Sequence, residues 1–277
     1  MAKWTKVQEQ RLQELNASKG QIDREFNGET ERNQSYQLLE KELSSHAKAE
    51  LKEYQEKAGQ PALMEIGEII AGLLKANGFA QVTTPILLSK GLLAKMTIDE
   101  DHALFNQVFW IDQKKCLRPM LAPNLYFLNK DLLRIWEHPV KIFEIGPCFR
   151  KDSQGGEHMQ EFTMLNLVEM GLKEEECKGR LVELAEIVMQ AAGISEYVYE
   201  VESSEVYGST TDLVVNGLEV GSGAIGPHVL DRNWGITVPW VGIGLGLERL
   251  VMTVKGYNTV QRTGRSLTYL NGVRLNI

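Results

Sequence analysis

A long β-hairpin predicted between residues 141 and 168 constrains the fold of this chain more than any other feature. Two strand-like runs, residues 141–149 and 161–168, flank a polar loop that contains glycine. This arrangement is typical of two antiparallel strands joined by a long turn. Arg150 follows the first run, His158 lies near the end of the loop and Phe162 lies on the second run. Because guanidinium and imidazole groups bind phosphates and an aromatic ring stacks on a base, the hairpin predicts a nucleoside triphosphate site.

A second motif lies near the other end of the chain, where a predicted glycine-rich turn at residues 242–247 leads into a helix start with Arg249. The glycine spacing is one residue short of the dinucleotide fingerprint, and no acidic residue follows at the distance that such a site requires. Close approach of the backbone to a flat ligand is another reason for glycines here. Taken singly, Arg150 and Arg249 also suit exposed surface positions, since most arginines are exposed. The two motifs in this order are more specific than either alone.

The composition narrows the class of protein. A chain of 277 residues, 43% of them hydrophobic, can form one large domain or a domain with an extension. Its three cysteines are scattered and follow no disulfide or zinc spacing, which fits a reducing compartment. Because we find no apolar run long enough for a membrane span and no secretory signal, we expect a cytoplasmic protein without a membrane partner. The net charge of −7 argues against a surface that binds nucleic acid throughout.

The first part of the chain has the pattern of a helical extension. An amphipathic helix is predicted over residues 3–16, with an apolar face formed by Trp4, Val7, Leu12 and Leu15. Residues 29–58 are charged and helix-prone but contain few large apolar side chains, so they predict a peripheral helix. We therefore expect residues 1–59 to form a helical extension and residues 60–277 to form the main domain.

The main domain is predicted to begin with a buried helix and an edge strand. Pro61 suits a helix start, Gly78 suits the C-cap, and an apolar stripe lies between them at Leu63, Ile66, Ile69, Ile70, Leu73 and Leu74. Residues 81–88 predict a strand that Pro85 interrupts. Because proline cannot donate to a ladder, this strand lies at a sheet edge or meets another subunit.

The rest of the domain predicts an α+β fold. We expect a helix that opens near Leu121 and a long helix over residues 173–192, with short strands at 107–111, 115–120, 197–202, 211–215 and 218–225. The last three strands are separated by turns, which favours an antiparallel sheet flanked by helices.

Together, the hairpin and the glycine-rich motif resemble motifs 2 and 3 of class II aminoacyl-tRNA synthetases, and the helix and strand before Pro85 resemble motif 1, the dimer motif. The chain further resembles the pyrrolysyl-tRNA synthetase family in Met120–Tyr126, Val206–Gly208, Leu218–Ser222, Gly226-Pro227, Pro239-Trp240 and Tyr269–Gly272. This resemblance covers roughly residues 60 to 277. It implies a homodimer that uses ATP to join pyrrolysine to tRNA(Pyl).

The resemblance also assigns an ATP site. It implies that Arg150 binds the α-phosphate, that His158 and Arg249 bind the outer phosphates, and that Phe162 stacks on adenine. Catalysis would then depend on Arg150 and Arg249, which stabilise the charge that develops at the α-phosphorus. Glu219 and Ser222 would hold Mg²⁺, a cation that prefers hard oxygen ligands. Asp152 stands where the family usually has glutamate for the adenine amino group.

The amino-acid pocket that the resemblance implies is a large apolar chamber with two polar side chains. Asn166 would bind the amide carbonyl of the pyrrolysine side chain, and the Tyr207 hydroxyl would contact the ring nitrogen. The chamber would be lined by Ala122, Leu125, Tyr126, Asn129, Val168 and Trp240. Asn129 stands where the family usually has a larger apolar residue. Without the resemblance, Leu125, Tyr126 and Val168 would equally suit ordinary core packing.

Two other functions remain open on the sequence alone. A class II synthetase for another bulky amino acid, such as phenylalanine, is disfavoured because it would leave the Asn166 amide unpaired. A non-catalytic, tRNA-binding paralogue is disfavoured by the intact Arg150, Arg249 and Glu219. The chain carries no zinc-binding N-terminal tRNA domain, so we expect either a separate partner protein with that domain or a member that needs none. Residues 1–59 would contact tRNA, and the basic residues expected to bind its backbone are Lys3, Lys6, Arg11, Lys255, Arg262, Arg265 and Arg274.

Overall fold

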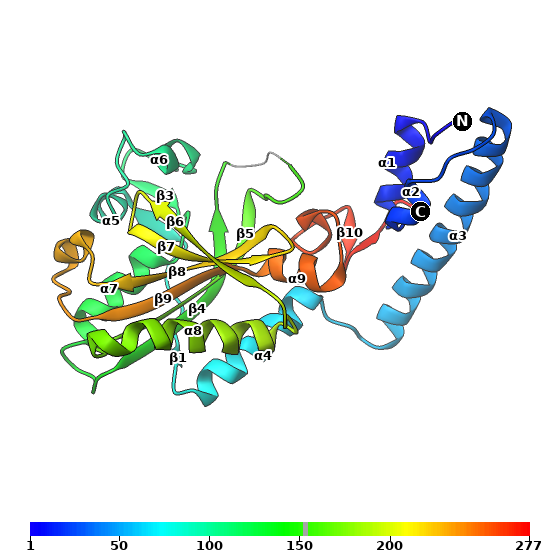
Figure 1. Cartoon of the computed structure of the whole chain (residues 1–277). Coiled ribbons are helices and arrows are strands. Elements are labelled where there is room, and N and C mark those ends of the chain that lie inside the picture. Colours follow the sequence, from blue (N-terminus) through cyan, green and yellow to red (C-terminus); the bar gives the residue numbers. More distant parts are fainter. Residues whose placement is uncertain (152–154) are drawn as a thin grey trace.

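A computed structural model of the chain describes residues 1–151 and 155–277 (Figure 1). A sheet flanked by helices forms the main body, and a group of helices stands apart at one end. Both chain termini lie in this outlying group (Figure 1). Among the described residues, no helix is long and apolar enough to cross a membrane.

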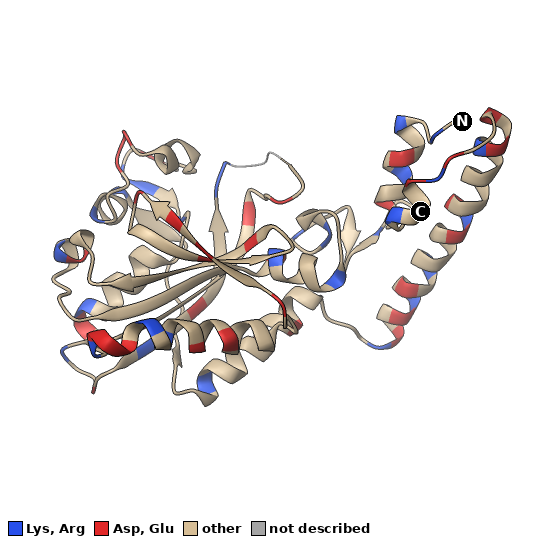
Figure 2. Ribbon diagram, viewed as in Figure 1, with Lys and Arg blue, Asp and Glu red and all other residues tan. Residues whose placement is uncertain are grey.

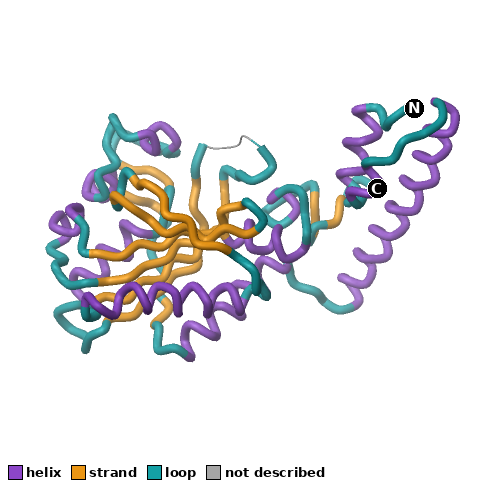
Figure 3. Tube along the Cα trace, in the orientation of Figure 1, coloured by secondary structure: helices purple, strands orange, loops and turns teal. Residues whose placement is uncertain are grey.

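The central sheet, whose strands run through the middle of the main body (Figure 3), is almost wholly antiparallel. Within the described part of the chain, its strands follow the order β1 (Ala80–Gln81), β4 (Val140–Phe149), β5 (Glu161–Met170), β9 (Trp240–Gly246), β8 (Leu218–Gly226), β7 (Gly208–Val215) and β6 (Val198–Ser204). Only the short edge pair of β1 and β4 is parallel. The predicted hairpin is confirmed as β4 and β5, which pair from Val140 and Met170 to Phe149 and Glu161.

One face of the sheet is covered by α4 (Ala62–Ala76), α8 (Glu174–Ala191) and α9 (Leu247–Lys255). Their apolar sides meet alternate residues of the central strands in one core, which includes Ile70, Leu184 and Leu250. α4 begins after Pro61, and Gly78 follows it with a positive φ of 84°, as the pattern predicts. The stripe is only partly buried, however, because Ile69 and Leu73 are 52% and 40% exposed.

The other face supports the site. A second core joins Val168, Met170 and Trp240 to a layer of shorter elements. These elements are β2 (Leu87–Ser89), α5 (Lys90–Lys95), α6 (Ala103–Gln107), β3 (Lys115–Leu117), α7 (Ala122–Leu132) and the 3₁₀ helix η1 (Val229–Trp234). This layer leaves room over the middle of the sheet, where the cavity described below lies.

The outlying helices form a small core of their own. They are α1 (Lys6–Glu14), α2 (Lys19–Ile22) and α3 (Glu29–Glu56). Trp4 packs on Phe26 with ring centroids 4.4 Å apart, and Leu12 and Leu39 complete the cluster. Acidic and basic side chains alternate along α3 (Figure 2), so this helix has no stripe of one charge.

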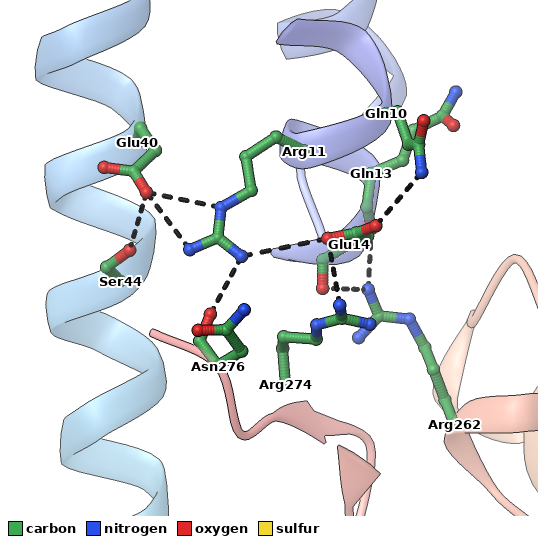
Figure 4. A network of polar contacts seen from close by, with 9 residues as sticks. All are labelled: Gln10, Arg11, Gln13, Glu14, Glu40, Ser44, Arg262, Arg274 and Asn276. Atoms are coloured by element: carbon green, nitrogen blue, oxygen red, sulfur yellow. Dashed lines mark hydrogen bonds and ion pairs between the residues drawn. The ribbon is translucent and has the colours of Figure 1, made fainter. Parts of the chain in front are cut away.

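A polar network joins the extension to the C-terminal segment (Figure 4). This segment contains the 3₁₀ helix η2 (Val260–Arg262) and the hairpin of β10 (Tyr269–Leu270) and β11 (Val273–Arg274). Arg262 donates to the backbone carbonyls of Gln13 and Glu14 at 2.6 and 2.7 Å, and Arg274 lies 3.5 Å from the Glu14 carboxylate. Arg11 donates to Glu40 and to the carbonyl of Asn276.

Several of the basic residues expected to bind the tRNA backbone are instead engaged within the protein. Arg262 is buried because its guanidinium donates to the carbonyl groups of Gly272 and Gln13. Arg11 and Arg274 are half-buried and paired with carboxylates. Arg265 is exposed but is 3.3 Å from the Glu161 carboxylate. Lys3 and Lys6 on the extension and Lys255 on α9 remain exposed.

Four local predictions were wrong. Val7 is 76% exposed because it precedes the buried Leu12 by five residues, a spacing that puts the two side chains on different sides of α1. Residues 107–111 form no strand; α6 ends at Gln107 and Trp110 makes a single bridge to Cys116. The strand at 81–88 is split into β1 and β2, with Pro85 between them. The glycine-rich segment is the strand β9 and not a turn.

Candidate active site

A cavity of about 530 Å³ lies over the sheet between β5, β7, β8, β9 and α7. Every predicted site residue that the structure describes lines it, namely Ala122, Leu125, Tyr126, Asn129, Arg150, His158, Phe162, Asn166, Val168, Tyr207, Glu219, Ser222, Trp240 and Arg249. Asp152, the remaining predicted residue, lies outside the described residues. Residues from distant parts of the sequence therefore meet in one chamber.

The floor of the cavity is a flat area of strands β5 and β9. Alternate residues of β5 line it, as expected for one face of a strand, from Phe162 through Asn166 to Met170. Opposite them on β9 lie glycines, with Asn166 paired to Gly244 and Val168 to Gly242. A Cβ atom on Gly244 would lie 3.3 Å from the Asn166 amide nitrogen. The glycines thus keep the β9 part of the floor free of side chains, which explains their spacing without a dinucleotide.

One end of the cavity is cationic. Arg249, near the start of α9, donates to the Glu219 carbonyl at 2.7 Å, and its guanidinium lies 3.2 Å from Nε2 of His158. The Glu219 carboxylate is 3.5 Å from the same guanidinium. Arg150 donates through Nε to the Pro119 carbonyl at 2.9 Å and lies 5.4 Å from the centre of the Phe162 ring. These contacts hold two guanidinium groups, an imidazole and an aromatic face in place around one space.

Oxygen ligands for a cation gather beside this end. A bulge at Val220 lets Glu219 and Ser222 pair with residues on one face of β7, so both side chains reach the cavity although they are three residues apart. The Ser222 hydroxyl donates to the Asp212 carboxylate at 2.6 Å. Among the described residues, no group of three His, Cys, Asp or Glu side chains is suited to a metal. A cation held here would therefore take most ligands from phosphate and water, as Mg²⁺ commonly does.

The opposite end of the cavity is aromatic and rests on one buried carboxylate, Asp231. This residue is 0% exposed and accepts hydrogen bonds from the Tyr126 hydroxyl, the Trp240 indole and the His228 backbone, each at 2.7 Å. Burial, with contributions from Tyr207 and Asp231, raises the pKa of Tyr126, which stays a neutral donor. The sequence analysis missed Asp231 because an aspartate in a short polar turn usually lies on the surface. Its flanking apolar residues, Leu230 and Trp234, were the available signal.

Between the two ends lies Asn166. Its amide nitrogen donates one N–H to the Ile243 carbonyl at 3.1 Å. A side-chain amide has a second N–H and a carbonyl oxygen, which leaves groups for a ligand. Tyr207 lies across the chamber with its ring 6.0 Å from Trp240, and burial raises the pKa of its hydroxyl.

Two further buried acids support the site and were also missed. Glu248 lines the cavity, and its carboxylate accepts from the Thr163 backbone N–H at 2.8 and 2.9 Å, which ties β5 to the start of α9. The carboxylate of Glu144 on β4 is 2.7 Å from the Arg118 guanidinium. The next residue, Pro119, provides the carbonyl that accepts from Arg150. Both acids act across long sequence separations, so no local pattern identifies them.

Comparison with known proteins decides the family. The family described as tRNA synthetases class II core domain (F) matches residues 46–270. A crystal structure of pyrrolysyl-tRNA synthetase from Desulfitobacterium hafniense is 53% identical, covers 100% of this chain and 99% of that chain, and superposes with a TM-score of 0.95. A second structure of a pyrrolysyl-tRNA synthetase from the same organism is 51% identical, with coverages of 100% and 96% and a TM-score of 0.92. The chain belongs to the pyrrolysyl-tRNA synthetases.

This membership confirms the predicted fold class, the enzyme class and the family resemblance, and class II synthetases use ATP. More distant similarity links the chain to O-phosphoserine–tRNA(Cys) ligases. Those of Methanocaldococcus jannaschii and Methanopyrus kandleri are 24% and 26% identical over 52% and 56% of this chain. The chain spans only about a third of the length of these curated relatives, 29% and 31%.

Proposed function

We propose that this protein activates pyrrolysine with ATP and transfers the acyl group to the 3′ end of tRNA(Pyl). The observation that supports the proposal is the difference between the two ends of the cavity. A cationic end with a stacking ring adjoins a long apolar chamber in which the Asn166 amide keeps hydrogen-bonding capacity. A phenylalanine side chain would leave that amide unpaired, whereas an Nε-acyl-lysine brings a matching carbonyl.

In the first step, an oxygen of the pyrrolysine carboxylate attacks the α-phosphorus of ATP. A bond forms between them, and the bond to the bridging oxygen breaks, so pyrophosphate leaves with the electron pair. We assign to Arg150 the α-phosphate and to Arg249 and His158 the outer phosphates, with Phe162 stacked on adenine. Pre-placed guanidinium groups stabilise the charge that develops at phosphorus. The carboxylate is already ionised, so this step needs no general base.

In the second step, a ribose hydroxyl at the tRNA 3′ end attacks the carbonyl carbon of the adenylate. The bond from this carbon to the phosphate oxygen breaks, AMP leaves with the electron pair, and the hydroxyl proton passes to a phosphate oxygen or to water. The protein contributes by positioning both reactants. We also propose that Glu219 and Ser222 hold Mg²⁺, which when bound neutralises charge on the phosphate oxygens. The hydrogen bond from Ser222 to Asp212 turns a lone pair of the hydroxyl oxygen toward the cavity.

Amino-acid-dependent ATP–pyrophosphate exchange tests the proposal. A panel should contain pyrrolysine, an Nε-acyl-lysine, lysine, phenylalanine and O-phosphoserine. We expect exchange with pyrrolysine and the acyl-lysine, and rates with the other three lower by at least about 10²-fold, since each leaves buried polar groups unpaired. Equal exchange with phenylalanine would overturn the proposal, and a lack of exchange with every amino acid would favour a non-catalytic paralogue.

We propose that the protein acts as a homodimer through α4. Ile69 and Leu73 lie one helical turn apart on its exposed side, where a monomer would leave apolar surface in water. Replacing both with glutamate should convert a dimer to a monomer in sedimentation. Lys75→Glu, on the same helix, is the matched control and should leave the dimer intact. A wild-type protein that sediments as a monomer would contradict this proposal.

We further propose that residues 1–59 contact tRNA. Arg11 is half-buried and paired with Glu40, whereas Lys3 and Lys6 of the predicted cluster on this extension are exposed, although Lys3 lies 3.3 Å from the Glu25 carboxylate. Replacing both with alanine should lower the slope of log affinity against log salt by about one for each lost phosphate contact. Pyrophosphate exchange should stay unchanged, and an unchanged salt slope would show that the extension is only structural. Tight tRNA binding by the chain alone would also argue against a required N-terminal-domain partner.

A further inference from the structure

Asn129 on α7 is a buried amide without a hydrogen-bond partner among the described residues. Its side chain is 0% exposed, and neither Oδ1 nor Nδ2 is paired. Such groups are rare in folded proteins, because burial removes hydrogen bonds to water that nothing then replaces. An unpaired amide at this position therefore calls for an explanation.

Other asparagines near the cavity are satisfied by the fold. Asn124, on the same helix, donates to the Thr84 hydroxyl at 2.8 Å and to the Pro85 carbonyl at 2.9 Å. Asn166 on β5 donates to the Ile243 carbonyl. The fold thus pairs these amides, whereas Asn129 has no partner among the described residues; the ring nitrogens Nε1 of Trp234 and Nε2 of His228, which pack beside Tyr126 and Tyr207, are likewise buried and unpaired.

Asn129 lines the cavity at the aromatic end. It follows Leu125 and Tyr126 by four and three residues, so the three side chains share one face of the helix. Tyr126 lies 5.9 Å from the ring of Trp240, and Trp240 pairs with Met170, the last residue of β5. Phe162, which we assign to adenine, lies at the opposite end of that strand. Asn129 therefore belongs to the part of the chamber farthest from the nucleotide.

The core into which α7 packs is formed by hydrophobic residues. The core on this side of the sheet contains Val168 and Met170, and partly buried Leu128, Leu132 and Leu133 pack against it. A leucine at position 129 would complete this packing without an unpaired group. The amide is consequently unfavourable in the protein alone and becomes favourable only when a ligand supplies the missing partner.

We propose that Asn129 is a specificity-determining residue that hydrogen-bonds a polar atom in the distal part of the amino-acid side chain. This inference rests on the proposed function and specifies its substrate class. Asn166 binds the amide in the middle of the side chain, and Asn129 binds a ring nitrogen or oxygen beyond it, the atom that the family resemblance assigns to the Tyr207 hydroxyl. The enzyme then favours lysine derivatives with a polar acyl group over those with a hydrocarbon acyl group of the same size.

Two lysine carbamates test the proposal, one with a cyclopentyl ring and one with a tetrahydrofuran ring, which differ by one ether oxygen. In pyrophosphate exchange, wild type should prefer the ether ring by roughly 10-fold in kcat/KM, the effect of one buried hydrogen bond. Asn129→Leu, with Asn129→Met as a second variant, should abolish the preference and still activate the cyclopentyl compound. Val168→Ala is the control, because it changes the volume of the chamber and should leave the preference unchanged.

Thermal unfolding of the ligand-free enzyme provides an independent readout. Asn129→Leu should raise Tm by roughly 2–4 °C, since it removes an unpaired amide, whereas Asn124→Leu should lower it. If Asn129→Leu lowers Tm as Asn124→Leu does, then Asn129 has a partner within the protein and the proposal is overturned. An unchanged ring preference in the Asn129 variants would also overturn it while leaving the proposed function intact. Failure of the wild type to activate pyrrolysine and both carbamates would instead refute the proposed function.

Discussion

The two ends of the cavity are built in different ways. At the cationic end, Arg249 contacts His158 and Glu219, so the residues that we assign to ATP position one another. At the aromatic end, Tyr126 and Trp240 do not bond each other but share a buried carboxylate behind them. The first end therefore depends on the groups that touch the ligand, and the second depends on a residue, Asp231, that lies behind the wall. This difference predicts where a substitution changes catalysis and where it changes selectivity.

The largest effect is expected at the cationic end. Arg249→Ala or Arg150→Ala should lower pyrophosphate exchange by roughly 10²–10³-fold, the usual cost of removing one transition-state donor. The loss should be the same for every amino acid that the enzyme accepts. Lys255→Ala, at the exposed end of the same helix as Arg249, is the matched control and should keep full activity. Near-normal exchange in both arginine variants would contradict the assignment of this end.

Glu248 predicts a pH dependence of stability. Burial raises the pKa of its carboxyl from 4.5 to about 7, although the Thr163 N–H opposes the shift. Because the folded-state pKa lies above the unfolded value, the folded protein holds the proton more tightly between these values. The stabilisation is complete below pH 4.5 and is lost as pH rises toward 7.

Chemical denaturation at a series of pH values checks this prediction. Relative to Glu248→Gln, the free energy of unfolding of wild type should fall by up to about 3 kcal/mol between pH 5 and pH 8. The Gln variant does not titrate but keeps a carbonyl that can accept from the Thr163 N–H, so it is a reference with the same hydrogen bond. Parallel pH curves for the two proteins would show that Glu248 does not titrate in this range.

A smaller effect, concentrated on one substrate, is expected from Asp231→Asn. Tyr126 donates to Oδ1 and Trp240 to Oδ2. Because an amide replaces one of these oxygens by a donor NH2 group, one of the two side chains loses its partner at a cost of about 1–3 kcal/mol. We expect KM for the amino acid to rise by roughly 10-fold while KM for ATP stays the same. Combination with Tyr126→Phe should be less than additive, since both changes affect one bonded group. An equal rise in both KM values would mean that Asp231 supports the whole domain.

The sequence predicts site residues that lie in local motifs better than residues whose partners lie on other elements. Arg150, Phe162 and Arg249 could be found because they lie in motifs with local spacing. Asp231 and Glu248 were missed, since their partners lie on other elements and a lone acid usually remains exposed. The bulge at Val220, which brings Glu219 and Ser222 to one face, depends on pairing with β7. Arg262 was expected on the surface because its partners, Gln13 and Glu14, lie about 250 residues away.

The central claim is that selectivity belongs to the aromatic end with Asn166, and catalysis to the cationic end. The most direct test is the ratio of kcat/KM for pyrrolysine to that for phenylalanine, measured by pyrophosphate exchange in wild type, Arg249→Ala, and the double variant Asn166→Ala with Val168→Ala. The account predicts that the arginine variant loses activity with an unchanged ratio. The double variant should lower the ratio by at least about 10²-fold, because it removes a buried hydrogen bond and admits a bulky ring. A double variant that loses both activities equally, with its ratio unchanged, would contradict the account.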